Sequence, residues 1–122
     1  MIVAGLGFNS KATPDSLADA LDATGYATSV SVLATPEDKL KAPVILDFAK
    51  SRGLLVLPIQ PHQLEAVQTH TQSVVSRMMR RIGSVAEAAA LAAAGPNAAL
   101  LATRKISDDR TATCAIAKGA TP

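Results

Sequence analysis

The residues best suited to bind an acidic ligand are cations in the second half of the chain. Arg77, Arg80 and Arg81 lie at the end of one expected helix, and Arg104 and Lys105 lie at the end of an expected strand. Arginine pairs with carboxylates through two parallel hydrogen bonds, so these residues could clamp a carboxylate-bearing ligand. A solvated face that complements a helix dipole explains them equally well, and both interpretations stay open.

Glu87 also has two interpretations. The run from Ser84 to Glu87 matches a capping box, in which Ser84 caps a helix and Glu87 reaches back to the Ser84 amide. Gly95 is a matching helix stop. Alternatively, Glu87 acts as a general base, with Lys39 as an electrostatic stabiliser of a hydrolytic reaction. The spacing favours capping.

Glycines follow the first expected strand, at Gly5 and Gly7, with Phe8 directly after them. Glycines at a strand end let a ligand approach the backbone, and Gly83 offers the same freedom. A full dinucleotide fingerprint requires a third glycine where Ser10 stands, so a tight turn is the simpler interpretation.

The composition excludes several other classes of site. His62 and His70 stand apart from other ligand-type residues, and Cys114 is the single cysteine, so we expect no metal and no cofactor. Ser73 lies in no G-x-S-x-G motif and suits a helix start. Aromatic residues make up 2% of the chain and the net charge is +2, which argues against a nucleic-acid partner. We expect no membrane segment and a cytoplasmic location.

Periodicity and punctuation predict alternating strands and helices. Expected strands cover 2–5, 29–33, 54–57, 98–103 and 111–117, and expected helices follow Thr13-Pro14 and cover 43–51, 71–81 and 84–94. The early strand–helix–strand order favours parallel pairing, and a short turn makes the last two strands antiparallel. We therefore expect a single α/β domain over 1–122. It should have three layers (α/β/α) and a mixed, mostly parallel sheet of about five strands.

The order and spacing of five short segments resemble the CobE/CbiG C-terminal domain family of cobalamin (vitamin B12) biosynthesis. The resemblance extends from residue 2 to about residue 117. It rests on segments 3–8, 33–35 with 38–39, 71–73, 83–95 and 112–117.

This resemblance implies a role in building the corrin ring. Two-domain relatives open a lactone of cobalt-precorrin-5A and release acetaldehyde, and this chain has the size of their C-terminal domain alone. It therefore looks more like the single-domain member of the aerobic pathway. The implied function is to bind a precorrin-type tetrapyrrole or hand it on, with other corrin-pathway enzymes as implied partners. The alternatives are a precorrin hydrolase and, less favoured, a nucleotide-binding module.

Precorrins carry many carboxylates around a flat ring, so a binder needs cations and close backbone approach. We expect one cleft bordered by the glycine turn, the Lys39 loop and the start of the Ser84 helix. The candidate ligand-binding residues are Gly5, Gly7, Phe8, Thr35, Lys39, Ser73, Arg80, Arg81, Gly83, Ser84, Arg104 and Lys105.

Overall fold

Five strands form one sheet in the order β3-β2-β1-β5-β4. The computed structural model describes residues 1–64, 82–95 and 97–119, with side chains left out at 82–84. The strands are β1 (Ile2–Phe8), β2 (Val32–Pro36), β3 (Val56–Ile59), β4 (Ala99–Ile106) and β5 (Ala112–Lys118). Parallel pairs join β1 to β2 and β2 to β3, whereas β5 is antiparallel to both β1 and β4. The mixed α/β sheet is confirmed. "Mostly parallel" holds for strand directions, because only β5 runs against the others, but not for the pairings.

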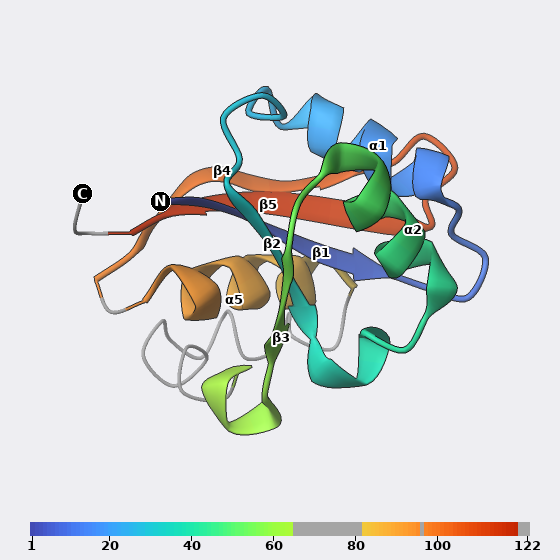
Figure 1. The fold of residues 1–122 in the computed structure, drawn as a ribbon. Coiled ribbons are helices and arrows are strands. Elements are labelled where there is room, and N and C mark those ends of the chain that lie inside the picture. The colour runs from blue at the N-terminus through green and yellow to red at the C-terminus, as the bar shows by residue number, and fades with distance from the viewer. Residues whose placement is uncertain (65–81, 96, 120–122) are drawn as a thin grey trace.

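Helices cover both faces of the sheet (Figure 1). Helices α1 (Pro14–Ala23) and α2 (Pro43–Arg52) lie on one face, and α5 (Ile82–Ala94) lies on the other. A short 3-10 helix, η1 (Glu37–Lys39), follows β2. The three-layer arrangement predicted from the sequence is therefore present.

The start of α1 and the end of α2 follow the sequence signals. Thr13 and Ser16 form a reciprocal capping box, with the Thr13 amide donating to Ser16 Oγ at 3.1 Å. Pro14 is the first helical residue, where its missing amide hydrogen costs nothing. Helix α2 ends at Gly53, which adopts a left-handed φ of 67°.

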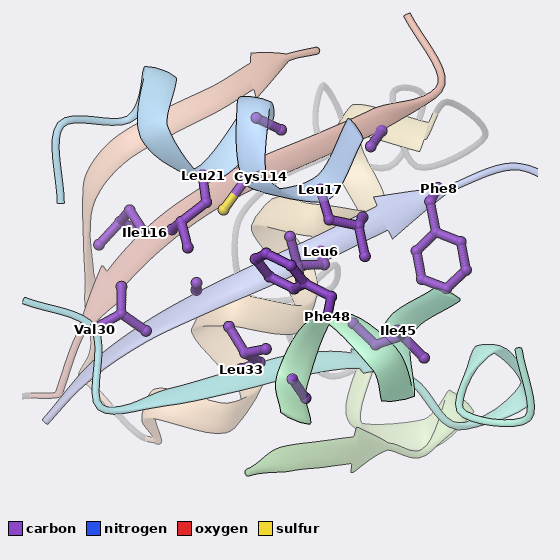
Figure 2. Packing of buried hydrophobic residues seen from close by; sticks show 14 residues of the cluster. Leu6, Phe8, Leu17, Leu21, Val30, Leu33, Ile45, Phe48, Cys114 and Ile116 are labelled. Atoms are coloured by element: carbon purple, nitrogen blue, oxygen red, sulfur yellow. The ribbon is translucent and has the colours of Figure 1, made fainter. Parts of the chain in front are cut away.

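The core on the α1/α2 face is built from larger aliphatic and aromatic side chains (Figure 2). Leu6 of β1, Leu17 of α1 and Phe48 of α2 are almost fully buried there. Phe8 belongs to the same cluster, because alternate residues of a strand point to the same face. This face supplies most of the bulky apolar packing.

The α5 face is packed by small residues, and Gly5 is the point of closest approach. A Cβ atom added to Gly5 would lie 2.6 Å from the Ala90 amide nitrogen and 2.8 Å from the Ala90 Cβ. Ala86, Ala89 and Ala90 are all buried on the helix side. Strand β1 continues to Phe8 instead of ending at residue 5, so the expected glycine turn is wrong. The missing side chain of Gly5 admits a helix, and a ligand cannot occupy that space.

Helix α5 begins before the predicted start at residue 84. Because α5 runs from Ile82 to Ala94, Ser84 lies within its first turn and not at the N-cap. The Glu87 carboxylate accepts a hydrogen bond from the Arg104 backbone N–H. The predicted capping box is therefore wrong, although the predicted helix is present.

Candidate functional site

The carboxyl ends of β2 and β3 are the place where the chain leaves the sheet in opposite directions. After β2 the chain enters η1 and then α2 on one face. After β3 it enters a helical turn at residues 61–64, whose Leu64 packs with the apolar cluster on the α5 face. In open α/β sheets, a crevice forms where neighbouring strands send their connections to opposite faces. The topology therefore predicts a candidate ligand crevice between the loops after β2 and β3.

A pocket of about 470 Å³ occupies this position. The β2 side contributes Pro36, Glu37, Asp38 and Lys41, and the β3 side contributes Ile59, Pro61 and Leu64. Ile59 is buried and Leu64 half-buried, so the inner wall is apolar, whereas Glu37, Asp38 and Lys41 are exposed at the mouth. An apolar wall with a few polar groups is the usual composition of a small-molecule site.

Lys39 lies away from this pocket. Its ammonium nitrogen is 5.6 Å from the centroid of the Phe8 ring, a cation–π contact on the α1/α2 side of the sheet. The start of α5 lies on the opposite face. The expected cleft shared by Lys39 and the start of the Ser84 helix is therefore wrong. Phe8, 3% exposed, supports Lys39 and leaves little surface for a ligand.

Thr35 and Gly7 have structural partners inside the sheet. The buried Thr35 hydroxyl donates to the Leu6 carbonyl oxygen at 3.1 Å, which joins β2 to β1. Gly7 is buried within β1, opposite Thr113 of β5. Neither residue is exposed to the pocket, because both lie inside strands that continue past the predicted strand ends.

Glu87 joins α5 to the edge strand β4. Its Oε2 atom accepts a hydrogen bond from the Arg104 backbone N–H at 3.0 Å. Pairing of β4 with β5 shifts register between Ala102 and Lys105, and such bulges disturb the regular ladder. Because the carboxylate occupies a main-chain donor at an open sheet edge, Glu87 has a structural role here.

The cations at the end of β4 are separated from the pocket. Arg104 is half-buried and Lys105 is exposed at the carboxyl edge of the sheet, because β4 runs parallel to β1. Three strand spacings separate β4 from β2, which amounts to about 14 Å. These two residues can therefore contact only a ligand that extends across the sheet edge.

The remaining predicted residues are placed by their backbone or lie outside the described part. Gly83 and Ser84 are in the first turn of α5 at the carboxyl edge of the sheet, since α5 leads into the start of β4. Ser73, Arg80 and Arg81 lie outside the described residues, so they remain predictions.

A hydrogen-bonded turn closes the sheet between β4 and β5. Asp109 accepts hydrogen bonds from the hydroxyls of Ser107 at 2.6 Å, Ser16 at 2.5 Å and Thr111 at 2.7 Å. These bonds, led by the one from Ser107, hold the pKa of Asp109 far below its ordinary value. The bond to Ser16 ties this turn to the start of α1. The cluster is thus a structural link between this turn and α1.

Cys114 is fully buried in β5, and burial raises the pKa of its thiol well above the ordinary value. The described residues contain no group of three or more His, Cys, Asp or Glu side chains placed to hold a metal ion. No helix in the described ranges is long and apolar enough to cross a membrane.

Sequence reasoning did not identify the pocket residues Glu37, Asp38, Ile59, Pro61 and Leu64 as site residues. Two signals point to them. Pro36 and Pro61 mark the ends of neighbouring strands, and the loops that follow carry charged or amphipathic residues. What the sequence could not supply is the divergence of the two loops to opposite faces.

Comparisons with known proteins agree with this fold. Residues 2–117 match the sequence model of the family described as "Cobalamin synthesis G C-terminus". The crystal structure of cobalamin biosynthesis protein chiG from Agrobacterium tumefaciens is similar at 33% identity and a TM-score of 0.79, covering 99% of this chain and 100% of that one. CobE, a protein from the cobalamin (vitamin B12) biosynthetic pathway, is similar at 27% identity and a TM-score of 0.80, covering 100% and 92%.

A longer structure shares the fold alone. A cobalamin biosynthesis protein G homologue from Sulfolobus solfataricus has 17% identity and a TM-score of 0.68, and the match covers 95% of this chain but 36% of that one. No curated protein sequence matches the chain significantly. The family match across nearly the whole chain, together with two similar structures of full coverage, shows that this chain belongs to the CobE/CbiG C-terminal domain family of cobalamin biosynthesis proteins.

Proposed function

We propose that this protein binds a precorrin-type tetrapyrrole intermediate in the cytoplasm and holds it or hands it on to other corrin-pathway enzymes. The observation that carries the proposal is the pocket of about 470 Å³ between the loops after β2 and β3, in a chain of a cobalamin biosynthesis family. Its volume lies within the roughly 300–1,000 Å³ of small-molecule sites. Its apolar wall suits the ring, and its polar mouth suits the charged rim.

Lys41 is the described cation that lines this pocket. A hydrogen bond from an ammonium group to a carboxylate contributes about 1.5–3 kcal/mol before the costs of ordering and desolvation. Together with burial of part of the ring, a few such contacts would give a micromolar complex, or about −8 kcal/mol. Arg80 and Arg81, proposed from the sequence, would supply further contacts.

A hydrolytic function receives less support. It would require Glu87 as base and Lys39 as stabiliser to act on one ligand. Instead, the Glu87 carboxylate binds the Arg104 N–H, and the Lys39 ammonium lies over the Phe8 ring. Binding without turnover is therefore the function that we propose first. A nucleotide site is disfavoured because the α5 backbone covers Gly5.

The test is a titration of purified protein with isolated precorrins, followed by absorbance at low and high salt. We expect saturable binding that weakens with salt, because the rim contacts are exposed. Lys41→Gln should weaken binding, and so should the double replacement of Arg80 and Arg81 by Ala. Lys50→Gln is the matched control, since Lys50 is an exposed lysine of α2 that does not line the pocket.

Two outcomes would change the proposal. If no precorrin binds at any salt concentration, the binding function is wrong. If the isolated protein converts a precorrin, seen as a mass change or as released acetaldehyde, the hydrolytic alternative replaces it.

A further inference from the structure

We propose that the pocket between the loops after β2 and β3 selects its ligand by charge. It would accept an apolar edge of a polycarboxylate ring and disfavour an edge crowded with ionised carboxylates. This inference rests on the proposed function and deepens it, because it names which side of the ligand enters. It comes from the sign and the position of the charges around one cavity.

The two sides of the pocket differ in chemistry. Among the described residues, the β3 side contributes apolar side chains, those of Ile59, Pro61 and Leu64. The β2 side carries the carboxylates of Glu37 and Asp38, which are neighbours in η1. A ring edge that bears methyl groups can lie against the β3 side without meeting a like charge.

Lys41 is the single positive charge among the described lining residues, against two negative charges. The balance of the described lining is therefore negative, although the whole chain has a formal net charge of +2. One ligand carboxylate can pair with Lys41. A second carboxylate beside it would face Glu37 or Asp38, so a further carboxylate on this edge of the ring would reduce the affinity.

No other charged residue of the described ranges lines the pocket. Lys39 is held over the Phe8 ring, and Arg104 and Lys105 lie about three strand spacings away, roughly 14 Å. That distance exceeds the screening length of about 8 Å at physiological ionic strength. Glu37 and Asp38 are therefore the described charges that line the pocket beside Lys41.

The experiment uses a charge series of soluble tetrapyrroles as probes: uroporphyrin, which has eight carboxylates, and coproporphyrin, which has four. Affinities are measured by fluorescence titration for the parent protein and for Glu37→Gln/Asp38→Asn. The quantity compared is the ratio of coproporphyrin to uroporphyrin affinity. Within each protein, this ratio cancels the apolar contribution to binding that the two probes share. Asp47→Asn on α2 is the matched control, because Asp47 is exposed and does not line the pocket.

We expect the double variant to lower this ratio about three- to tenfold by strengthening uroporphyrin binding. A change of this size corresponds to two screened like-charge interactions at about 6–10 Å near a protein surface. The difference should shrink at about 1 M salt, where the Debye length falls to about 3 Å. Lys41→Gln should weaken both probes.

The outcomes separate this inference from the proposed function. If the parent protein binds the probes but the double variant leaves the ratio unchanged, charge selection is wrong and tetrapyrrole binding stands. If Asp47→Asn changes the ratio as much as the double variant does, the effect is one of overall charge and the pocket assignment is wrong. If the parent protein binds neither these probes nor isolated precorrins, both ideas are wrong.

Discussion

Gly5→Ala tests the contact between β1 and α5 most directly. The added Cβ would lie 2.6 Å from the Ala90 amide nitrogen and 2.8 Å from its Cβ, and it would also overlap the Ala86 carbonyl oxygen. Real Cβ atoms do not approach backbone atoms so closely, and neither a central strand nor a helix backbone can move aside alone. Overpacking usually costs about 1–3 kcal/mol. Because the overlap here is with backbone, we expect a loss of about 3 kcal/mol or more in the free energy of unfolding.

Urea denaturation followed by far-UV circular dichroism measures this loss. With a slope of about 1.5 kcal/mol per molar urea, 3 kcal/mol lowers the midpoint by about 2 M. Gly53→Ala is the matched control, because it adds the same methyl group where nothing lies within 4 Å. An alanine held at the left-handed φ of 67° should lower the free energy of unfolding by only about 1 kcal/mol. The reasoning is refuted if Gly5→Ala is no less stable than Gly53→Ala.

Three further predictions concern single contacts. Glu87→Ala should destabilise by about 1–2 kcal/mol in urea denaturation, because the Arg104 N–H loses its acceptor, and Glu87→Gln should cost less because it keeps an acceptor oxygen. Asp109 has a lowered folded-state pKa, so its contribution to stability is complete above its unfolded pKa and is lost as the pH falls. Asp109→Asn should therefore be less stable than the parent at pH 7, and this gap should narrow at pH 3; a constant gap would contradict the assignment. Cys114 should resist an aromatic disulfide reagent in the folded protein and react at once in urea, since burial disfavours its thiolate; rapid labelling without denaturant would contradict the described burial.

Local signals predicted the starts and stops of elements well where the cap residues are contiguous in sequence. Thr13-Pro14 begins α1 as expected, and α2 ends at Arg52 before Gly53, one residue beyond the expected end at residue 51. Each of these signals acts through the backbone of its own or the next residue, so no tertiary information is needed. The three-layer α/β class also followed from the order of elements alone.

The site could be predicted only in part, because its geometry depends on tertiary contacts. Gly5 and Gly7 were interpreted as a turn, since the sequence does not reveal that α5 lies directly over β1. Glu87 has the spacing of a capping residue, yet its carboxylate accepts a hydrogen bond from Arg104, a strand residue 17 positions further along the chain. The pocket depends on two loops that diverge, which is a property of topology and not of any motif.

The position of β5 between β1 and β4 has a consequence for how the protein acquires its structure during synthesis. Every residue of β1 from Ile2 to Phe8 pairs with a residue between Ala112 and Lys118, so the first and last strands are partners. Strand β4 is held in the sheet through β5. A nascent chain can therefore assemble β1, β2 and β3 early, but one side of β1 stays open until Lys118 has left the ribosome. Loop-closure entropy makes such long-range pairing slow, and the open flank of β1 is the strand edge on which a chaperone would act.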